Sequence, residues 1–427
     1  MPIETIAEKD EEIARLRSLV ASFLQVNSSL VLDTVLENTL RRATELTGAA
    51  IGSIALIDET REFLQFVQST DLSKEKIKAL RVPIDKGISG HVVQTGKPVR
   101  VEDCYTDSRF YSQVDSNVGS RTKTYLCVPL IADGVVIGTT QIMNRRDGGR
   151  FSERDEELLM GFSQQAALAI KNAQRHELML RKKEIDAELA LCAQIQANFF
   201  PKEIPQPKGY EVFGSTVPCL EVGGDYYTFI PRRNGIYEAF QADVSGKGVA
   251  AALTVSEIHC AVNLLADSDA SLADRTEALN RHLGRSLVAG RFATLLGLDL
   301  DPPTGALEAV VAGHPAPWIV SPDGSARAVA RTRPVLGPGP FQRVKGTARK
   351  ECLAPGELLV AFTDGYSEAD TPAGELYGEK RVVDVVREVR RLDLPSIRSR
   401  LDAAVLEFQS GQPQADDMSL ILLRRRA

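Results

Sequence analysis

The segments VGGDYY at residues 222–227 and ADVSGKGVAAAL at residues 242–253 decide how the second half of this chain folds. Each joins an apolar or glycine-rich strand to a single aspartate. Asp225 directly follows a glycine pair, and Asp243 precedes a turn that contains two glycines. Glycine allows the backbone to turn sharply beside a strand end, so both aspartates are expected at an edge of a sheet.

Two further strands carry acids at their ends. Asp364 ends the apolar strand in FTDG, and Asp416-Asp417 precede the strand in DDMSLILLRR. Taken singly these patterns are ordinary, because TDG is usually a turn, a paired DD is usually solvated and GGD is often a bulge. Their joint occurrence on separate strands predicts that the acids converge at one sheet edge. Buried carboxylates are costly unless they are paired or bind metal, and oxygen ligands of this kind suit Mg²⁺ or Mn²⁺.

The order of strands and helices predicts two domains of α+β type. Residues 30–174 alternate helices with short strands that imply an antiparallel sheet, with a hairpin turn at Asp133-Gly134. From residue 201 onward, short hairpin-linked strands with helices grouped between them predict a β-sandwich flanked by helices. An amphipathic helix is expected at residues 1–29.

A charged segment at residues 175–200 links the two domains; it contains no glycine or proline and ends before Pro201. Apolar residues recur every seven positions, which favours a two-stranded coiled coil, although a single surface helix packed on its own domain is the other interpretation. The seam positions are Leu178, Ile185, Cys192 and Phe199, with Lys182, Leu189 and Gln196 between them.

Composition narrows the class of protein. The chain has 427 residues, 43% hydrophobic and 25% charged, with a net charge of −6, which is typical of a soluble protein of two or three domains. This negative net charge argues against a basic surface that binds nucleic acid. We also expect no membrane span or signal peptide. Six scattered cysteines without a CxxC pair favour reduced thiols and a cytoplasmic location.

Residues 194–427 resemble the metal-dependent PPM-type serine/threonine phosphatases, in the bacterial SpoIIE/RsbU-like branch. Seven blocks occur in the family's order: QANFFP (196–201), VGGDYY (222–227), ADVSGKGVAAAL (242–253), FATLLGLDLD (292–301), VAGHPAP (311–317), FTDGYSEA (362–369) and DDMSLILLRR (416–425).

The resemblance implies a set of metal ligands. Asp243 and the backbone carbonyl of Val244 would bind a centre of two Mn²⁺ or Mg²⁺ ions, and Asp364 and Asp416 would each hold a metal. Asp225 would contact the site directly or through water. By the same resemblance, a water that bridges the metals attacks phosphorus, so that no protein nucleophile is required.

Other residues near these blocks have weaker roles. The resemblance places Asp417 and Gly365 as supports for the ligands rather than as ligands. His314, in AGHP, is either a general acid or a structural histidine. Arg291 and Lys247 are two candidates for holding the phosphate group.

Residues 30–174 resemble a GAF domain through GISGHVVQTGKPVRVEDCYTDSRF (87–110) and the segment at 125–173. Their ligand is unknown: a cyclic nucleotide, another small molecule, and dimerisation without a ligand are the three alternatives. Cys104 and Cys127 are more simply core thiols than sensing groups. A motif similar to one in cyclic-nucleotide-binding GAF domains is expected to brace the fold; it comprises Asn144, Arg145, Phe151, Asp155 and Glu156.

Together these expectations describe a GAF-regulated, homodimeric, cytoplasmic protein phosphatase. The GAF domain would set the packing of the coiled coil, and helices at 249–266 and 271–287 would shift to complete the metal site. By resemblance the substrate is a phosphorylated STAS-domain anti-anti-sigma factor in a partner-switching pathway. The alternatives are an inactive dimeric scaffold and a metallophosphodiesterase.

Overall fold

A computed structural model describes residues 32–118 and 121–427. The chain divides between Lys183 and Glu184 into two compact units. The amphipathic helix expected at residues 1–29 lies outside the described residues.

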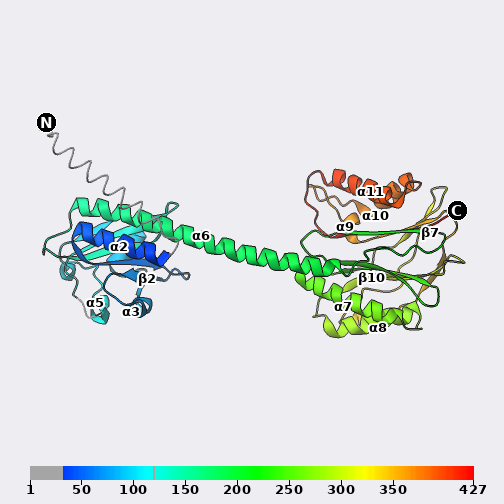
Figure 1. The fold of residues 1–427 in the computed structure, drawn as a ribbon, viewed down its shortest axis with the longest axis horizontal. Helices are drawn as coiled ribbons and strands as arrows, with labels where there is room; N and C mark the ends of the chain where they lie inside the picture. Colours follow the sequence, from blue (N-terminus) through cyan, green and yellow to red (C-terminus); the bar gives the residue numbers. More distant parts are fainter. Residues whose placement is uncertain (1–31, 119–120) are drawn as a thin grey trace. The chain divides into compact units, whose positions relative to one another are not determined.

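The first unit is built on a six-stranded antiparallel sheet with the order β3-β2-β1-β6-β5-β4 (Figure 1). Its strands are β1 (Ala49–Ile57), β2 (Phe63–Ser69), β3 (Arg81–Pro83), β4 (Val99–Val101), β5 (Tyr125–Ala132) and β6 (Val135–Arg145). Its helices are α2 (Leu32–Thr47), α3 (Lys74–Ala79), α4 (Gly87–Thr95), η1 (Cys104–Thr106), α5 (Gln113–Val118) and the first part of α6 (Glu153–Ala197).

Two features of this unit follow directly from its sequence. Apolar residues of α2 and of the first turns of α6 pack together on one face of the sheet, as the clusters around Leu40 and Phe162 show. The hairpin between β5 and β6 turns at Asp133 and Gly134, whose φ angles of 49° and 78° are the positive values that a two-residue turn of this kind requires. The expected hairpin is therefore present.

The second unit contains two five-stranded antiparallel sheets, with the orders β14-β11-β10-β9-β8 and β13-β12-β15-β16-β7. The first sheet comprises β8 (Asp225–Pro231), β9 (Tyr237–Val244), β10 (Ala293–Leu300), β11 (Ala306–Ala312) and β14 (Arg349–Cys352). The second comprises β7 (Tyr210–Val217), β12 (Trp318–Val320), β13 (Ala326–Ala328), β15 (Leu358–Phe362) and β16 (Met418–Arg425).

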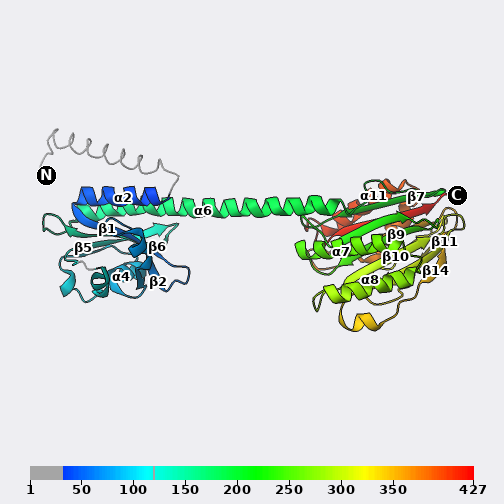
Figure 2. The same cartoon turned by 60° about the horizontal axis from the view of Figure 1, so that its bottom comes forward.

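The two sheets pack face to face and helices cover their outer faces (Figure 2). Side chains of both sheets, such as Leu298 and Ile421, share one buried cluster between them. A second cluster joins the first sheet to α7 (Val249–Ala266) and α8 (Leu272–Ser286), and a third joins the second sheet to the remaining helices. Those helices are α9 (Asp364–Ser367), α10 (Gly378–Val389) and α11 (Leu394–Gln409), with η2 (Gly339–Arg343) in a connecting loop. The predicted α+β fold, with a β-sandwich flanked by helices, is confirmed.

Two helices need separate comment. Helix α7 has 18 residues and is long and apolar enough by composition to cross a membrane, yet it buries one face, including Val255 and Ile258, in the core beside the first sheet. Helix α6 runs without a break through the predicted linker to Ala197. Most of its side chains between residues 175 and 195 are exposed, including the seam residues Leu178 and Ile185.

The end of α6 differs from the predicted seam. Gln196 is buried and hydrogen-bonded to Gly223, and the ring of Phe199 stacks on His259 of α7. These two predicted seam positions are therefore occupied by contacts within the second unit. Near Pro201, the residues of the heptad pattern therefore make tertiary contacts within the second unit rather than a helix–helix seam.

Candidate metal centre

Asp225 and Asp243 lie directly opposite each other in the antiparallel pair of β8 and β9. Asp225 begins β8 and Asp243 is the last residue but one of β9, so the turns next to both aspartates lie at the same edge of the sheet. The glycine before Asp225 allows close approach of the next strand, because a Cβ at Gly224 would lie 2.7 Å from the carbonyl oxygen of Val244. Three of the predicted ligands thus come together by strand pairing.

The second sheet brings its own acids to this edge. Strand β15 ends one residue before Thr363, and Asp364 begins the short helix α9. The Thr363 hydroxyl donates a 2.7 Å hydrogen bond to Oδ2 of Asp225, which joins the edges of the two sheets. Sequence patterns do not reveal this contact, because it depends on how the sheets stack.

Asp417 is held by the backbone. Its Oδ1 accepts a hydrogen bond from the Cys219 N–H at 2.8 Å, and its Oδ2 accepts one from the Gly224 N–H at 2.6 Å. Close packing requires glycine at two neighbouring positions: a Cβ at Gly223 would lie 2.4 Å from Oδ2 of Asp417, and one at Gly365 would lie 1.9 Å from its carbonyl oxygen. Both carboxylate oxygens of Asp417 therefore fix the loop before β8.

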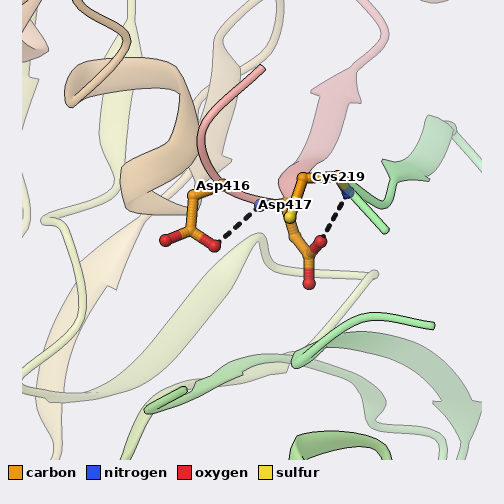
Figure 3. A group of neighbouring side chains, drawn as sticks. All are labelled: Cys219, Asp416 and Asp417. Carbon is orange, nitrogen blue, oxygen red and sulfur yellow. Dashed lines mark hydrogen bonds between the residues drawn. The ribbon is translucent and has the colours of Figure 1, made fainter. Parts of the chain in front are cut away.

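The carboxylate of Asp416 contacts both the Asp417 backbone and a lysine. One of its oxygens accepts the Asp417 N–H, and the other lies 3.2 Å from Nζ of Lys247. Figure 3 shows Asp416, Asp417 and Cys219 as neighbours. Across residues 32–118 and 121–427 these three form the one group of potential ligands whose atoms all lie within 4.8 Å of one another.

This trio is not the predicted ligand set. Burial, followed by the charge of Asp417, raises the pKa of the Cys219 thiol to about 11, and a thiol suits soft metals rather than Mg²⁺ or Mn²⁺, which prefer oxygen ligands. Asp416 is the member that the resemblance predicts as a ligand.

The raised pKa values of the acids at this sheet edge indicate a site for cations. Burial, and then the neighbouring Asp243, raise the pKa of Asp225 well above its usual range. Burial, and then Asp364 and Asp416, raise the pKa of Asp243 to about 7. Burial, followed by Glu368 and Asp416, raises the pKa of Asp364 to about 6. Carboxylates that repel one another in a buried place, all with oxygen donors, fit hard divalent cations such as Mg²⁺ or Mn²⁺.

Sequence reasoning missed Glu368. It is exposed, lies one helical turn after Asp364, and raises the pKa of both Asp364 and Asp243 through its charge. The signal was present in FTDGYSEA, because residues four apart in a helix share a face.

His314 is fully buried rather than placed as an acid. Its Nδ1 lies 2.7 Å from the Thr294 hydroxyl and its Nε2 lies 3.4 Å from Oε1 of Gln241. Burial lowers the pKa of His314 to about 3, which keeps the ring neutral at physiological pH. This geometry supports the structural interpretation.

The two candidate cations differ in their surroundings. Lys247 is paired with Asp416, whereas Arg291 donates a hydrogen bond to the carbonyl oxygen of Ser245 and lies against Gly246. Lys247 therefore lies on the loop that follows Asp243, and Arg291, from the segment between α8 and β10, contacts that loop.

The first unit contains a cavity of about 90 Å³. Its polar floor is internally satisfied: Tyr125 and Ser89 each donate a 2.6 Å hydrogen bond to Oε1 of Gln141, whose amide donates to Ser53. Apolar residues form most of the walls, including Ile51, Phe66, Leu72, Leu80, Val82, Ile88, Phe110 and Met143.

The other residues singled out in this unit brace the fold. Arg145 forms a 2.9 Å ion pair with Asp155 at the start of α6, and Asn144 accepts the Lys123 N–H. Phe151 is buried in the core, and Arg100 pairs with Glu156. None of the five motif residues lines the 90 Å³ cavity.

The thiols of the first unit lie in its core. Cys104 and Cys127 are fully buried, and burial raises the pKa of each thiol to about 12.

Comparisons with known proteins agree with this architecture. The family model for "Stage II sporulation protein E (SpoIIE)" matches residues 234–426, and the model for "GAF domain" matches residues 31–170. Asp225 precedes the first of these ranges. The solved "SiaA-PP2C domain of Pseudomonas aeruginosa" superimposes with a TM-score of 0.50 at 22% identity, covering 57% of this chain and 98% of that one, which shows the shared fold.

Each curated relative is similar to only part of this chain. The chain is 26% identical over 246 residues to "Phosphoserine phosphatase RsbU" of Bacillus subtilis (strain 168), covering 57% of this chain and 72% of that protein. It is 30% identical over 188 residues to "Probable 3',5'-cyclic phosphodiesterase pde-5" of Caenorhabditis elegans, covering 41% of this chain. The chain spans only 26%, 9% and 13% of the length of this and two further phosphodiesterases that it matches.

The family models, the sandwich fold and the acidic edge lead to one assignment: the chain joins a GAF domain to a phosphatase domain of the PPM type, in its SpoIIE/RsbU-like branch.

Proposed function

We propose that this protein is a metal-dependent phosphatase that hydrolyses phosphoserine or phosphothreonine on a partner protein. The observation that carries the proposal is the meeting of buried Asp225 with half-buried acids from both sheets at one edge. The pKa values of Asp225, Asp243 and Asp364 are raised, and Lys247 is paired with Asp416. The similarity to "Phosphoserine phosphatase RsbU" supports the reaction class.

Asp225, Asp243, Asp364 and Asp416, with the carbonyl of Val244, would hold two Mn²⁺ or Mg²⁺ ions. When bound, such ions supply activation of a water nucleophile and neutralisation of phosphoryl charge. The protein's own contribution is to fix these oxygens: Thr363 orients Asp225, and the Asp417 carboxylate ties down the preceding loop.

The test is Mn²⁺-dependent release of phosphate from a phosphoserine peptide by the full chain and by Asp364→Asn. Asp301→Asn, which changes a carboxylate in a distant turn of the same domain, is the matched control. Activity in the parent and the control, lost in Asp364→Asn, supports the proposal. A parent that releases no phosphate while binding Mn²⁺ contradicts it, and hydrolysis of cyclic AMP or GMP in the same assay would favour a phosphodiesterase.

The substrate that we infer is a phosphorylated STAS-domain anti-anti-sigma factor in a partner-switching pathway, in the cytoplasm. It rests on similarity to the RsbU branch, so the assay compares this phosphoprotein with the isolated phosphopeptide. A higher kcat/KM for the phosphoprotein supports the inference, and equal values contradict it.

Regulation is assigned to the first unit. We infer that the chain forms a homodimer through its GAF domain and the exposed part of α6. The cavity beside Gln141 would take a small, mainly apolar effector, because its walls are mainly apolar and its floor is satisfied, with Asp71, Lys86 and Asp115 as the charged residues of its lining. Thermal-shift screening of the full chain, with cyclic nucleotides included, tests this inference, and stabilisation by cyclic nucleotides alone contradicts it.

A further inference from the structure

We propose that Gln196 is a positioning residue that connects the last turn of α6 to the carboxylates of the metal centre. The inference rests on the proposed function, since it takes those carboxylates to be metal ligands. Gln196 is 7% exposed, whereas the residues before it on α6, from 181 to 188, are all exposed. A polar side chain buried at the end of an otherwise exposed helix indicates a specific contact.

The contact is a double hydrogen bond to one residue. The Gln196 carboxamide donates to the Gly223 carbonyl oxygen at 2.7 Å and accepts the Gly223 N–H at 3.1 Å. A carboxamide presents a donor and an acceptor side by side, so this pair defines both the position and the orientation of the Gly223 backbone. The end of α6 is therefore fixed to the loop that enters β8.

The first residue proposed to bind metal lies two positions after Gly223 in the sequence. The next residue, Gly224, donates its N–H to Oδ2 of Asp417, and Asp225 begins the strand. The same Asp417 oxygen packs so closely on Gly223 that a Cβ there would lie 2.4 Å away. A shift of the Gly223 backbone must therefore move Asp417, Asp225 or both.

A second contact holds the other side of Asp225. The Phe199 ring stacks on His259 with centroids 5.0 Å apart, and Nδ1 of His259 lies 3.0 Å from the Tyr226 hydroxyl. The end of α6 and the turn that follows it thus act on both sides of Asp225, directly at Gly223 and at Tyr226 through His259. A rotation of α6 about its axis would disturb both contacts together, so the state of the helix sets the affinity of the site for metal.

The test uses Gln196→Met in the full chain, because methionine keeps the side-chain length and removes both hydrogen bonds. Gln194→Met, at an exposed position two residues earlier on α6, is the control. Gln196→Glu keeps an acceptor for the Gly223 N–H but loses the donor, and it serves if the methionine variant does not fold. The readouts are Mn²⁺ affinity by calorimetry and amide hydrogen exchange of residues 222–226 without metal.

We expect Gln196→Met to bind Mn²⁺ roughly tenfold more weakly, the lower end of the effect seen when partners of metal ligands are removed. Exchange at Gly223 and Gly224 should accelerate by a similar factor, while Gln194→Met matches the parent and Gln196→Glu lies between them. Unchanged Mn²⁺ affinity in a folded Gln196→Met overturns the inference, as does a general loss of protection across the domain. Phosphate release is not used here, so a parent that binds Mn²⁺ without hydrolysing phosphoserine contradicts the proposed function alone.

Discussion

Asp225 and Asp243 lie opposite each other in the antiparallel pair of β8 and β9, and among the described contacts no lysine or arginine forms an ion pair with either carboxylate. Opposed like charges destabilise a sheet, and burial adds to the cost. Ionising both carboxylates is therefore costly, and a bound cation would lower that cost.

Asp225→Asn tests this relationship. The amide removes a buried charge and still offers an oxygen to the Thr363 hydroxyl, so the metal-free protein should become more stable by about 1 kcal/mol or more. Mn²⁺ at a hundredfold excess over its Kd should stabilise the parent by about 2.7 kcal/mol but not the variant. Urea unfolding with and without Mn²⁺ measures both; equal stabilisation of parent and variant by Mn²⁺ would show that Asp225 is not involved.

In the proposed site, Lys247 would compete with metal for Asp416. Its Nζ lies 3.2 Å from Oδ2 of Asp416, and a partly exposed pair of this kind contributes at most about 1 kcal/mol. Lys247→Met should therefore tighten Mn²⁺ binding by up to about fivefold. Calorimetry against Lys208→Met, an exposed lysine of the same domain, checks the effect; weaker binding in Lys247→Met would mean that the lysine supports the site instead.

Gly223 has no room for a side chain. Alanine there would push Asp417 away from the Gly224 N–H, so Gly223→Ala should lose about 1–3 kcal/mol of stability and most Mn²⁺ affinity. Gly149→Ala, in the first unit, is the control, since its Cβ would meet only the side chains of Asp147 and Arg145. Thermal unfolding and calorimetry would contradict the packing argument if the two variants behaved alike.

His314 should make the domain sensitive to acid. Its pKa is about 3 when folded and 6.5 when unfolded, so below pH 6.5 the unfolded chain takes up a proton that the native ring does not. Stability is then complete above pH 6.5 and falls toward pH 3, by about 2 kcal/mol at pH 5. His314→Asn should be less stable at pH 7.5 but lose less between pH 7.5 and 5; urea titrations that decline in parallel would disprove the assignment.

Ile185 lies in the exposed part of the predicted seam, with half of its surface accessible. Ile185→Asp should place a charge within an apolar contact between two copies and convert dimers to monomers. Ala187→Asp adds the same charge off the seam and should leave dimers intact. Sedimentation velocity distinguishes them, and unchanged dimers in Ile185→Asp would remove this part of α6 from the interface.

Much of the fold was predictable because strand ends, glycines and acids form a local pattern. The antiparallel order that brings Asp225 opposite Asp243 follows from such a pattern. The role of Thr363 did not, and the supporting role of Asp417 was expected only from the family resemblance, because each depends on contacts between residues far apart in sequence. Gln196 is the clearest case: heptad spacing assigned it an imperfect seam position, whereas its carboxamide is used by a backbone nearly thirty residues later.

The anchoring of α6 at Gln196 also limits how this chain can vary in length. An α-helix turns about 100° per residue, so inserting one residue upstream swings every earlier side chain by that angle relative to the anchored end. Inserting seven restores the original direction to within about 20°. Natural variants of this architecture should therefore lengthen or shorten the segment between Ile170, the last buried residue of the first unit on α6, and Gln196 in sevens. Lengths that break this rule should uncouple the two domains.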